Sequence, residues 1–473
     1  MTLTLSDYFC GAGGSSSGAK LVPGVQVTHA FNHWQLALDT HALNHPEVDH
    51  QKADLSKANP RLYPRTDIGW FSPECTNHSQ AKGKRKHDRQ PDLFGETLPD
   101  EAAERSRSTM KDVLTFAAVH RYEAVIVENV VEVRDWAWWP NWLRELEALG
   151  YDHEIVYLNS MHAQQLGPGA PQSRDRIYIV AWRKACRRPD LRRWTRPPAY
   201  CQPCDQVVTP IQAWKDPNKQ FGKFGRSGQY VYRCPNLKCR NAVVNPEFLP
   251  AAAAIDWSLT GQRIGDRSRP LAPKTMARIR KGLATYGSQL LVPCGGTWRD
   301  RAEPLAKPMA TRTTVETDGL LVPVEGRTGT NARLTTGVFR AQTARLQDAL
   351  VVPLRNNAVA RPASTDPLMT VAAEGNHHMI VDYNGPAKPV TSPLPTQTAV
   401  EGNGLASIEI DPDDCAFRML EPHEIQAAMA FDPGYRLLGN RRERVRQLGN
   451  AVTPPAARDL IAAVAEAVNG TAP

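Results

Sequence analysis

The segment LTLSDYFCGAGGSSSG, residues 3–18, joins an apolar strand pattern to a glycine-rich turn and the start of a helix pattern. Gly11, Gly13 and Gly14 allow a tight turn and a close approach of the backbone to a ligand. The turn reads G-A-G-G rather than G-x-G-x-x-G, so a dinucleotide site is not indicated. A strand, turn and helix in this order predict the beginning of an α/β domain.

Strand and helix patterns continue to alternate up to about residue 185. Strands are predicted at 25–31, 67–71, 124–129, 154–159 and 176–182, and helices at 110–122 and 141–150. This alternation predicts a parallel, doubly wound sheet. The polar insert 80–108 is too long for an ordinary loop, so we interpret it as either functional or disordered.

The overall composition indicates a soluble protein with more than one domain. A chain of 473 residues exceeds one ordinary core, and its net charge of +8 favours a polyanionic partner. No N-terminal signal pattern and no apolar run of about 18 residues is visible, so we expect an intracellular protein without a membrane segment. Nine unevenly spaced cysteines suggest metal binding or catalysis rather than disulfides.

The middle of the chain has a different composition, rich in Pro, Gly, Thr and Arg from Cys186 to about residue 410. Apolar pairs recur in it every 30 residues, at 290–291, 320–321, 350–351 and 380–381. A fixed period favours stacked β repeats over the alternative, a Pro-rich linker. From 411 the pattern is helical again, with a predicted helix at 418–431 and a turn followed by a helix at 447–468. We expect this last segment to pack on the N-terminal sheet.

A single cysteine follows the predicted strand 67–71, in the sequence FSPEC that ends at Cys75. This position is the edge where open α/β sheets bind ligands. A lone cysteine is more often a small buried apolar residue. Pro73 and the polar residues 76–79 argue against burial here, so Cys75 is a candidate nucleophile.

Two further motifs place charged groups at strand ends. Glu128 ends the most apolar run of the chain and is either an active-site acid or a helix-capping group. Arg174 and Arg176 are two residues apart in a strand pattern, so they share one face and could make forked hydrogen bonds. The alternative for this pair is ordinary surface salt bridges.

Together these motifs resemble those of the C5-cytosine DNA methyltransferases. The resemblance rests on DYFCGAGG (7–14), SPECTNHS (72–79), ENV (128–130), QSRDR (172–176) and QLGNAVTPP (447–455), in that order. It covers about residues 1–185 and 415–473, while the middle of the chain varies in that family and carries target recognition.

The resemblance implies an enzyme that methylates cytosine at C5 in duplex DNA, with the target base flipped out of the helix. Cys75 would add to C6 of the ring and Glu128 would protonate N3. Arg174 and Arg176 would hold the base and the developing charge.

The resemblance also implies S-adenosylmethionine as cofactor, bound by Phe9, Gly11, Gly13, Asp54 and Asn450. The protein would act as a monomer on DNA in the cytoplasm, in a prokaryotic or phage-encoded setting. It would either protect DNA from a restriction nuclease as its functional partner or act as a solitary modification enzyme.

Two departures from the family pattern leave alternatives open. Glu74 and Thr76 replace the usual Pro and Gln beside the nucleophile, and His33 occupies a region where the family places an acid. The alternatives are the same chemistry on RNA, a modified sulfonium donor, or an inactive DNA-binding or regulatory relative. The long middle region argues against RNA, and the intact Cys75 and Glu128 argue against an inactive protein.

Four of the remaining cysteines form two close pairs, Cys201-x2-Cys204 and Cys234-x4-Cys239. Such paired spacing predicts a structural zinc site rather than unrelated thiols. Basic residues around the second pair, at 233, 238 and 240, are typical of a nucleic-acid contact.

These observations predict a doubly wound, Rossmann-like methyltransferase domain at 1–185 and a β-rich target-recognition region at 186–410. The recognition region would contain a zinc-ribbon-like part at 198–242 and the repeats at 285–410. A helical segment at 411–473 would return to the catalytic domain.

Overall fold

The computed structural model describes residues 2–73, 101–259, 261–286, 289–294, 299, 301–311, 318–323 and 411–470, and short strands between 350 and 407. The chain divides into two compact units. The first comprises Met1–Ala254, Pro308–Glu316 and Glu421–Pro473, and the second Ile255–Lys307 and Thr317–Leu420. Residues 186–254, including the paired cysteines, therefore share a unit with the N-terminal sheet rather than with the repeats.

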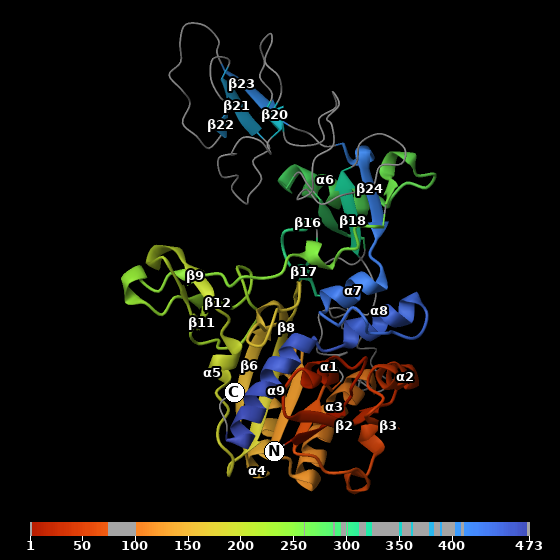
Figure 1. Ribbon diagram of the computed structural model, residues 1–473, viewed down its shortest axis with the longest axis vertical. Helices are drawn as coiled ribbons and strands as arrows, with labels where there is room; N and C mark the ends of the chain where they lie inside the picture. The colour runs from red at the N-terminus through yellow and green to blue at the C-terminus, as the bar shows by residue number, and fades with distance from the viewer. Residues whose placement is uncertain are drawn as a thin grey trace, which may run out of the picture. The chain divides into compact units, whose positions relative to one another are not determined.

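The first unit is built on a seven-stranded sheet of order β3-β2-β1-β4-β5-β8-β6 (Figure 1). Its strands are β1 (Leu3–Tyr8), β2 (Val25–Asn32), β3 (Asp49–Lys52), β4 (Ile68–Phe71), β5 (Ala124–Asn129), β6 (Tyr151–Asn159) and β8 (Asp175–Arg183). The strands predicted from the sequence are confirmed, and β3 is an additional one.

One strand departs from the predicted parallel arrangement. The pairs from β3 to β5 are parallel, whereas β8 runs antiparallel to both β5 and β6. The connection from β6 to β8 contains no crossover helix, so it returns the chain in the opposite direction. The reversal brings the start of β8 to the edge where β4 and β5 end.

Apolar side chains cover both faces of this sheet. Along β5, Val125 and Val127 belong to one buried cluster, and Ala124 and Ile126 belong to the other. Strands buried on both faces read as continuous apolar runs, which is why β5 shows no alternation in the sequence.

Helices lie on each face of the sheet. They are α1 (Gly14–Lys20), α2 (Gln35–Asn44), α3 (Glu101–His120), α4 (Trp139–Ala148), α5 (Leu191–Thr195) and α9 (Pro454–Asn469). The C-terminal helix α9 packs along α1, as Figure 1 shows. The approach is so close that a Cβ at Gly14 would overlap the carbonyl oxygen of Val452. No helix among the described residues is long and apolar enough to span a membrane.

The C-terminal segment differs in detail from its prediction. The predicted helix 418–431 is wrong at its start, because β24 (Cys415–Met419) pairs with β18 (Asp318–Pro323) there. Helix α7 (Pro422–Ala428) begins only at a capping box formed by Glu421 and Glu424. The predicted turn at 447–450 is the end of α8 (Arg441–Asn450).

The paired cysteines lie in a small β structure that we call the cysteine module, residues 199–244. It contains β9 (Ala199–Cys201), β10 (Gln206–Val208), β11 (Ile211–Trp214), β12 (Tyr230–Arg233) and β13 (Val243–Val244). These strands form a hairpin, β9-β10, and a three-stranded antiparallel sheet, β11-β12-β13. Buried Tyr230 and Tyr232 belong to the same apolar cluster as Val127 and Ile177 of the large sheet.

A two-stranded parallel ladder extends the first unit near the arginine motif. It joins β7 (Gln172–Ser173) to β17 (Met309–Ala310), which comes from far along the chain. The hydroxyl of Thr311 continues this contact by donating to the Ser173 carbonyl at 2.8 Å.

The second unit contains a five-stranded sheet of order β14-β24-β18-β15-β16. Besides β18 and β24, its elements are β14 (Gln262–Arg263), β15 (Leu290–Pro293), β16 (Glu303–Pro304) and α6 (Pro273–Tyr286). Further strands of this unit are β19 (Leu350–Val351), β20 (Arg361–Pro362), β21 (His378–Asp382), β22 (Lys388–Pro389) and β23 (Asn403–Ser407). The four apolar pairs of the 30-residue period lie on β15, β18, β19 and β21.

Candidate active site

An acid and a guanidinium meet where β5 ends and β8 begins. Arg176 Nε lies 2.8 Å from Glu128 Oε1, and the two side chains are only 12% and 11% exposed. An ion pair so shielded from water is stronger than a surface pair. The structure therefore brings together two of the residues that the sequence singled out.

Cys75 lies outside the described residues, together with Glu74, Thr76 and the insert up to residue 100. The chain leading to it is described as far as Pro73, which is buried. The side-chain amide of Asn129 donates to the Pro73 carbonyl at 3.5 Å, and Ser72 N donates to the Tyr8 carbonyl at 3.2 Å. The segment that carries Cys75 thus begins next to Asn129, which follows Glu128, and next to Tyr8 at the end of β1.

Arg174 has different surroundings from Arg176. It is 2% exposed, and its Nη2 donates to the carbonyls of Gly449 at 3.1 Å and Ala451 at 3.0 Å. These carbonyls flank Asn450, the residue expected to close the cofactor site. Arg174 was expected to hold the base, and its Nη2 contacts the turn that includes Asn450.

The glycine-rich loop has room for a ligand at one of its two candidate glycines. Phe9 and Gly11 adopt positive φ values of 60° and 54°. Among the described residues, a Cβ added at Gly11 would meet only the Phe9 carbonyl, at 3.9 Å, so this part of the structure leaves space above Gly11. At Gly13 a Cβ would collide with the side chains of Tyr435 and His41. Gly11 therefore fits a residue that faces a cofactor, and Gly13 is needed for packing.

Two further residues expected at the cofactor site, Asp54 and Asn450, are exposed at the ends of elements. Asp54 follows β3, with its side chain 53% exposed and 3.3 Å from Lys57 Nζ. Asn450 is exposed at the end of α8. An exposed carboxylate and an exposed amide can form hydrogen bonds with the amino and carboxylate groups of S-adenosylmethionine.

Several residues near this loop were missed by sequence reasoning. Tyr435 donates its hydroxyl to the Ala12 carbonyl, and the Arg446 guanidinium lies 4.6 Å from the ring centre of Trp34. Only Trp34, an aromatic residue two positions after β2, carried a local signal. The other contacts join segments too far apart in the chain for a motif to show them.

Buried polar side chains form a hydrogen-bond network at the start of α1, directly after the glycine-rich loop. Asp7 accepts hydrogen bonds from the hydroxyls of Ser15 and Ser16 at 2.6 Å each, and burial raises the pKa of Asp7 to about 6. Ser16 Oγ lies 2.9 Å from His41 Nε2, and burial holds the pKa of His41 well below its usual range. Neutral His41 thus joins the loop helix to α2 without a buried charge.

The structure brings the four paired cysteines together as one cluster. Their sulfur atoms all lie within 4.8 Å of one another, and Cys204 Sγ is 3.9 Å from Cys234 Sγ. Tetrahedral zinc with Zn–S bonds of about 2.3 Å places its sulfurs about 3.8 Å apart. Cys204 and Cys239 each end a 3-10 turn, and the next residues, Asp205 and Arg240, have φ values of 52° and 53°. The donor set and its spacing fit a tetrahedral metal ion.

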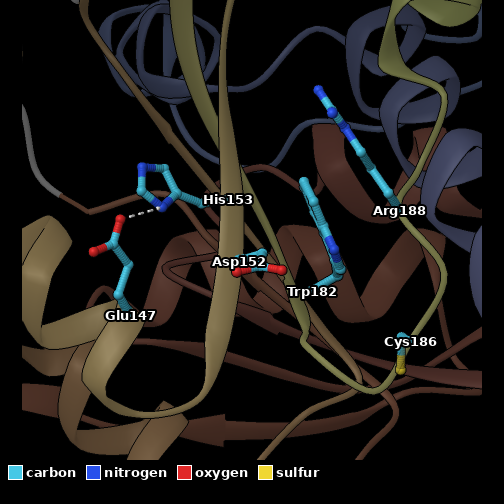
Figure 2. Close-up of a pocket in the computed structure, with 6 residues that line it drawn as sticks. All are labelled: Glu147, Asp152, His153, Trp182, Cys186 and Arg188. Atoms are coloured by element: carbon cyan, nitrogen blue, oxygen red, sulfur yellow. Dashed lines mark ion pairs between the residues drawn. The ribbon is translucent and has the colours of Figure 1, made fainter.

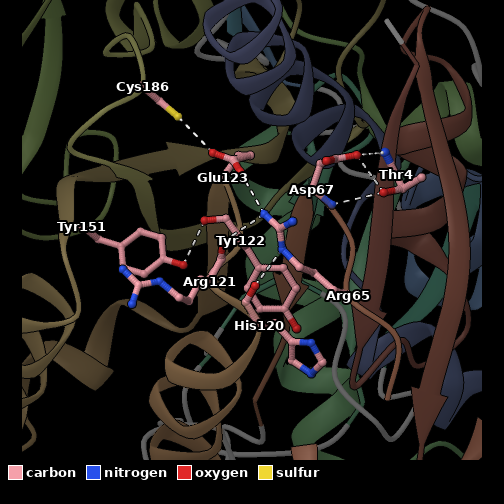
Figure 3. Close-up of polar contacts among 9 residues, drawn as sticks. All are labelled: Thr4, Arg65, Asp67, His120, Arg121, Tyr122, Glu123, Tyr151 and Cys186. Atoms are coloured by element: carbon pink, nitrogen blue, oxygen red, sulfur yellow. Dashed lines mark hydrogen bonds and ion pairs between the residues drawn. The ribbon is translucent and has the colours of Figure 1, made fainter. Parts of the chain in front are cut away.

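A hollow of about 400 Å³ lies at the opposite end of the strands from Glu128 (Figure 2). It is lined by Glu147, Asp152, His153, Trp182, Cys186 and Arg188. Polar contacts fasten the chain near this edge, as Figure 3 shows: Arg65 pairs with Glu123 at 2.9 Å, and Cys186 donates to Glu123 at 3.3 Å. These contacts join strand ends to one another, and we assign the hollow no part in the chemistry.

The sheet with one reversed strand, the glycine loop and the acid–arginine pair define the class of α/β methyltransferases. Residues 3–213 match the family model of the C-5 cytosine-specific DNA methylase. The resemblance found in the motifs is thereby confirmed.

Comparisons with individual proteins give more distant matches. The Type II methyltransferase M.AgeI of Thalassovita gelatinovora is 26% identical over 185 residues, which are 37% of this chain and 38% of that protein. The match thus spans less than half of the length of this relative. The structure of a DNMT2 mutant of Spodoptera frugiperda aligns with a TM-score of 0.48 and 12% identity, over 98% of this chain and 100% of the other. The methyltransferase EhMeth of Entamoeba histolytica aligns with a TM-score of 0.45 and 11% identity, over 98% of both chains.

Proposed function

We propose that this protein transfers a methyl group from S-adenosylmethionine to C5 of a cytosine flipped out of duplex DNA. The observation that carries the proposal is the shielded Glu128–Arg176 pair, set at the strand edge from which the chain leads to Cys75. The family of residues 3–213 and the positive net charge of the chain support the same substrate. The match to M.AgeI supports a role in DNA modification.

The residues divide the chemistry as follows. The thiolate of Cys75 adds to C6 of the ring, while Glu128 donates a proton to N3, so that C5 becomes nucleophilic. S-adenosylmethionine supplies the electrophilic methyl group that C5 accepts. Loss of the C5 proton to a base and return of the N3 proton to Glu128 then restore the double bonds of the ring and release the Cys75 thiolate. Because the thiol returns to its starting state, the residue acts catalytically.

Arg176 has the geometry to serve both the acid and the base. Its Nε contacts Glu128, and its Nη1 donates to the Asp175 carbonyl at 2.9 Å. Within the described part of the chain Nη2 makes no hydrogen bond, so it can donate to O2 of the cytosine. Arg174 instead positions Asn450, and through it the cofactor site.

We propose further that the cysteine cluster holds one structural Zn²⁺. Cys201, Cys204, Cys234 and Cys239 would bind it as thiolates and stabilise the small module around it. The target-recognition role of the repeats in the second unit also remains a proposal, as do action as a monomer and a restriction nuclease as functional partner.

The test is mass spectrometry of nucleosides from unmethylated genomic DNA incubated with the protein and S-adenosylmethionine. We expect a gain of one methyl group on deoxycytidine, absent with Cys75→Ala. DNA containing 5-fluorocytosine should form a covalent adduct with the wild type, because fluorine cannot leave as the C5 proton does. Methylation of RNA alone, or of neither polymer, would contradict the proposal and favour an RNA acceptor, a modified sulfonium donor or an inactive relative.

A further inference from the structure

The cysteine module contains a long loop between β11 and β12, residues 215–229. Hydrogen bonds within the loop stabilise its shape. The ammonium group of Lys215 donates to the carbonyls of Gly225 at 2.8 Å, Arg226 at 2.6 Å and Gly228 at 2.8 Å. Three carbonyl partners satisfy all the donors of one ammonium group. The loop is therefore a preformed element of the module.

This loop contacts the chain at both strand ends that carry the acid–arginine pair. The backbone N–H of Phe224 donates to Asp175 Oδ1 at 2.9 Å. Lys223 Nζ lies 2.6 Å from Glu132 Oε1, in an ion pair whose carboxylate is only 17% exposed. Asp175 directly precedes Arg176, and Glu132 lies in the 3-10 turn that follows β5. One loop thus connects the sequence next to Glu128 with the sequence next to Arg176.

Aromatic packing fixes the loop and its neighbours against the large sheet. The ring of Phe224 lies edge-on to His162, with centres 4.5 Å apart. Trp214, at the end of β11, packs edge-on against Tyr157 of β6 at 5.3 Å. Edge-to-face packing of rings stabilises a contact beyond simple burial. The module is therefore packed firmly onto the sheet.

Strand pairing explains why Arg176 needs this support. On the β5 side, the ladder with β8 ends at the pair Asn129–Ile177, so Arg176 lies one residue beyond it. On the other side Arg176 still pairs with Leu158 of β6. A strand end paired on one side only is more mobile than a fully paired one. Alternation along the strand directs Asp175 away from Arg176 and toward the loop.

We propose that the cysteine module positions the catalytic pair: loop 215–229, acting through Asp175 and Glu132, sets the placement of Arg176 relative to Glu128. The proposal rests on the proposed function, which makes Glu128 and Arg176 the catalytic pair. The contacts of the loop with Asp175 and Glu132 do not depend on that function. It makes Asp175 a positioning residue and gives the module a task besides target recognition.

The test compares variants of the full-length protein by hydrogen–deuterium exchange and by methyl transfer. Asp175→Ala and Lys223→Ala should raise exchange several-fold in peptides covering residues 130–135 and 172–176. Asp175→Asn should behave like the wild type, because its carbonyl oxygen still accepts from Phe224 N. Arg188→Ala is the matched control for Lys223→Ala, since it also breaks an exposed 2.6 Å ion pair, with Glu154, but near the opposite edge of the sheet.

Methyl transfer should respond in kcat. A shift of about 1 Å in a reacting group costs on the order of a hundredfold, so we expect Asp175→Ala to lower kcat by about tenfold to a hundredfold. The KM for S-adenosylmethionine should stay within about threefold, and Asp175→Asn should restore kcat.

Each outcome has a defined meaning. Unchanged exchange at 130–135 and 172–176 in both Asp175→Ala and Lys223→Ala would overturn the positioning role. An equal fall in kcat in Asp175→Ala and Asp175→Asn would also overturn the positioning role. If Asp175→Ala fails to fold, the exposed Lys223→Ala decides by the same two measurements. If the wild type methylates no nucleic acid but the exchange pattern holds, the proposed function fails and the positioning role stands.

Discussion

The guanidinium of Arg174 donates to the backbone carbonyl of Ala451 at 3.0 Å, across 277 residues of sequence. Arg174 also donates to the Gly449 carbonyl, so this buried side chain contacts the residues on both sides of Asn450. The arginine motif and the Gly-Asn motif are thereby a single structural unit. The start of β8 and the segment around Asn450 are linked through it.

Replacing Arg174 tests this link. In Arg174→Met the side-chain volume is nearly kept, but a buried and a partly buried carbonyl lose their donor, at about 1–3 kcal/mol each. We expect the free energy of unfolding to fall by about 3 kcal/mol and the Kd for S-adenosylmethionine to rise by about tenfold or more. Urea denaturation and calorimetric titration measure the two effects. Arg188→Met, at an exposed ion pair, should cost less than about 1 kcal/mol; equal losses in both variants would contradict the role of Arg174.

The packing of α1 on α9 predicts unequal effects of two glycine substitutions. Gly14→Ala forces a methyl group into the Val452 carbonyl, so helices must separate, and we expect a loss of about 3 kcal/mol or more. Gly150→Ala meets nothing within 4 Å and carries only the strain of its φ of 92°, at about 1 kcal/mol. Thermal unfolding of both variants checks the order, and a milder effect of Gly14→Ala would refute the close packing.

Metal analysis tests the cysteine cluster. Elemental analysis of the purified protein should find one zinc per chain, and Cys239→Ser should remove it. Loss of a structural ion costs several kcal/mol, so we expect Tm to fall by at least about 5 °C. Cys186→Ser is the matched control, because its hydroxyl can still donate to Glu123 and the thiol lies outside the cluster. Full stability without zinc would argue for four independent thiols.

Buried His162 predicts part of the acid sensitivity of the fold. Burial lowers the pKa of His162 from 6.5 to about 3, so the folded chain keeps it neutral while the unfolded chain binds a proton below pH 6.5. Its contribution to stability is complete above pH 6.5 and is lost as the pH falls from there toward about 3. In His162→Phe the ring packing is retained and this loss is removed. Between pH 6.5 and 5 the wild type should lose roughly 2 kcal/mol more than the variant, measured by urea denaturation.

Much of the sheet could be predicted because its strands are short, doubly buried apolar runs. AVIVEN at 124–129 became β5 with the predicted bounds. The direction of β8 could not be predicted, because an apolar run has the same periodicity in either direction. β24 was mistaken for helix because its strand form depends on pairing with β18, a contact about 100 residues away.

The candidate site shows the same division between local and distant information. The spacing of four cysteines sufficed to predict their cluster, since the ligand type and the short loops are local properties. For Arg174 and Arg176 a strand pattern gives the shared face but not the partners. Arg174 contacts the carbonyls of Gly449 and Ala451, whereas Arg176 pairs with Glu128. These contacts join distant parts of the chain, and they distinguish the two arginines.

The pairing of β17 with β7 has a consequence for anyone who would exchange parts between related enzymes. The polypeptide passes from one unit to the other four times, after residues 254, 307, 316 and 420. A unit joined to the rest of the chain by two junctions can be replaced as one continuous segment. The second unit has four junctions, so it cannot be replaced in this way. A graft of the second unit would have to leave residues 308–316 native to the recipient, or the edge strand beside the arginine motif would be foreign to it.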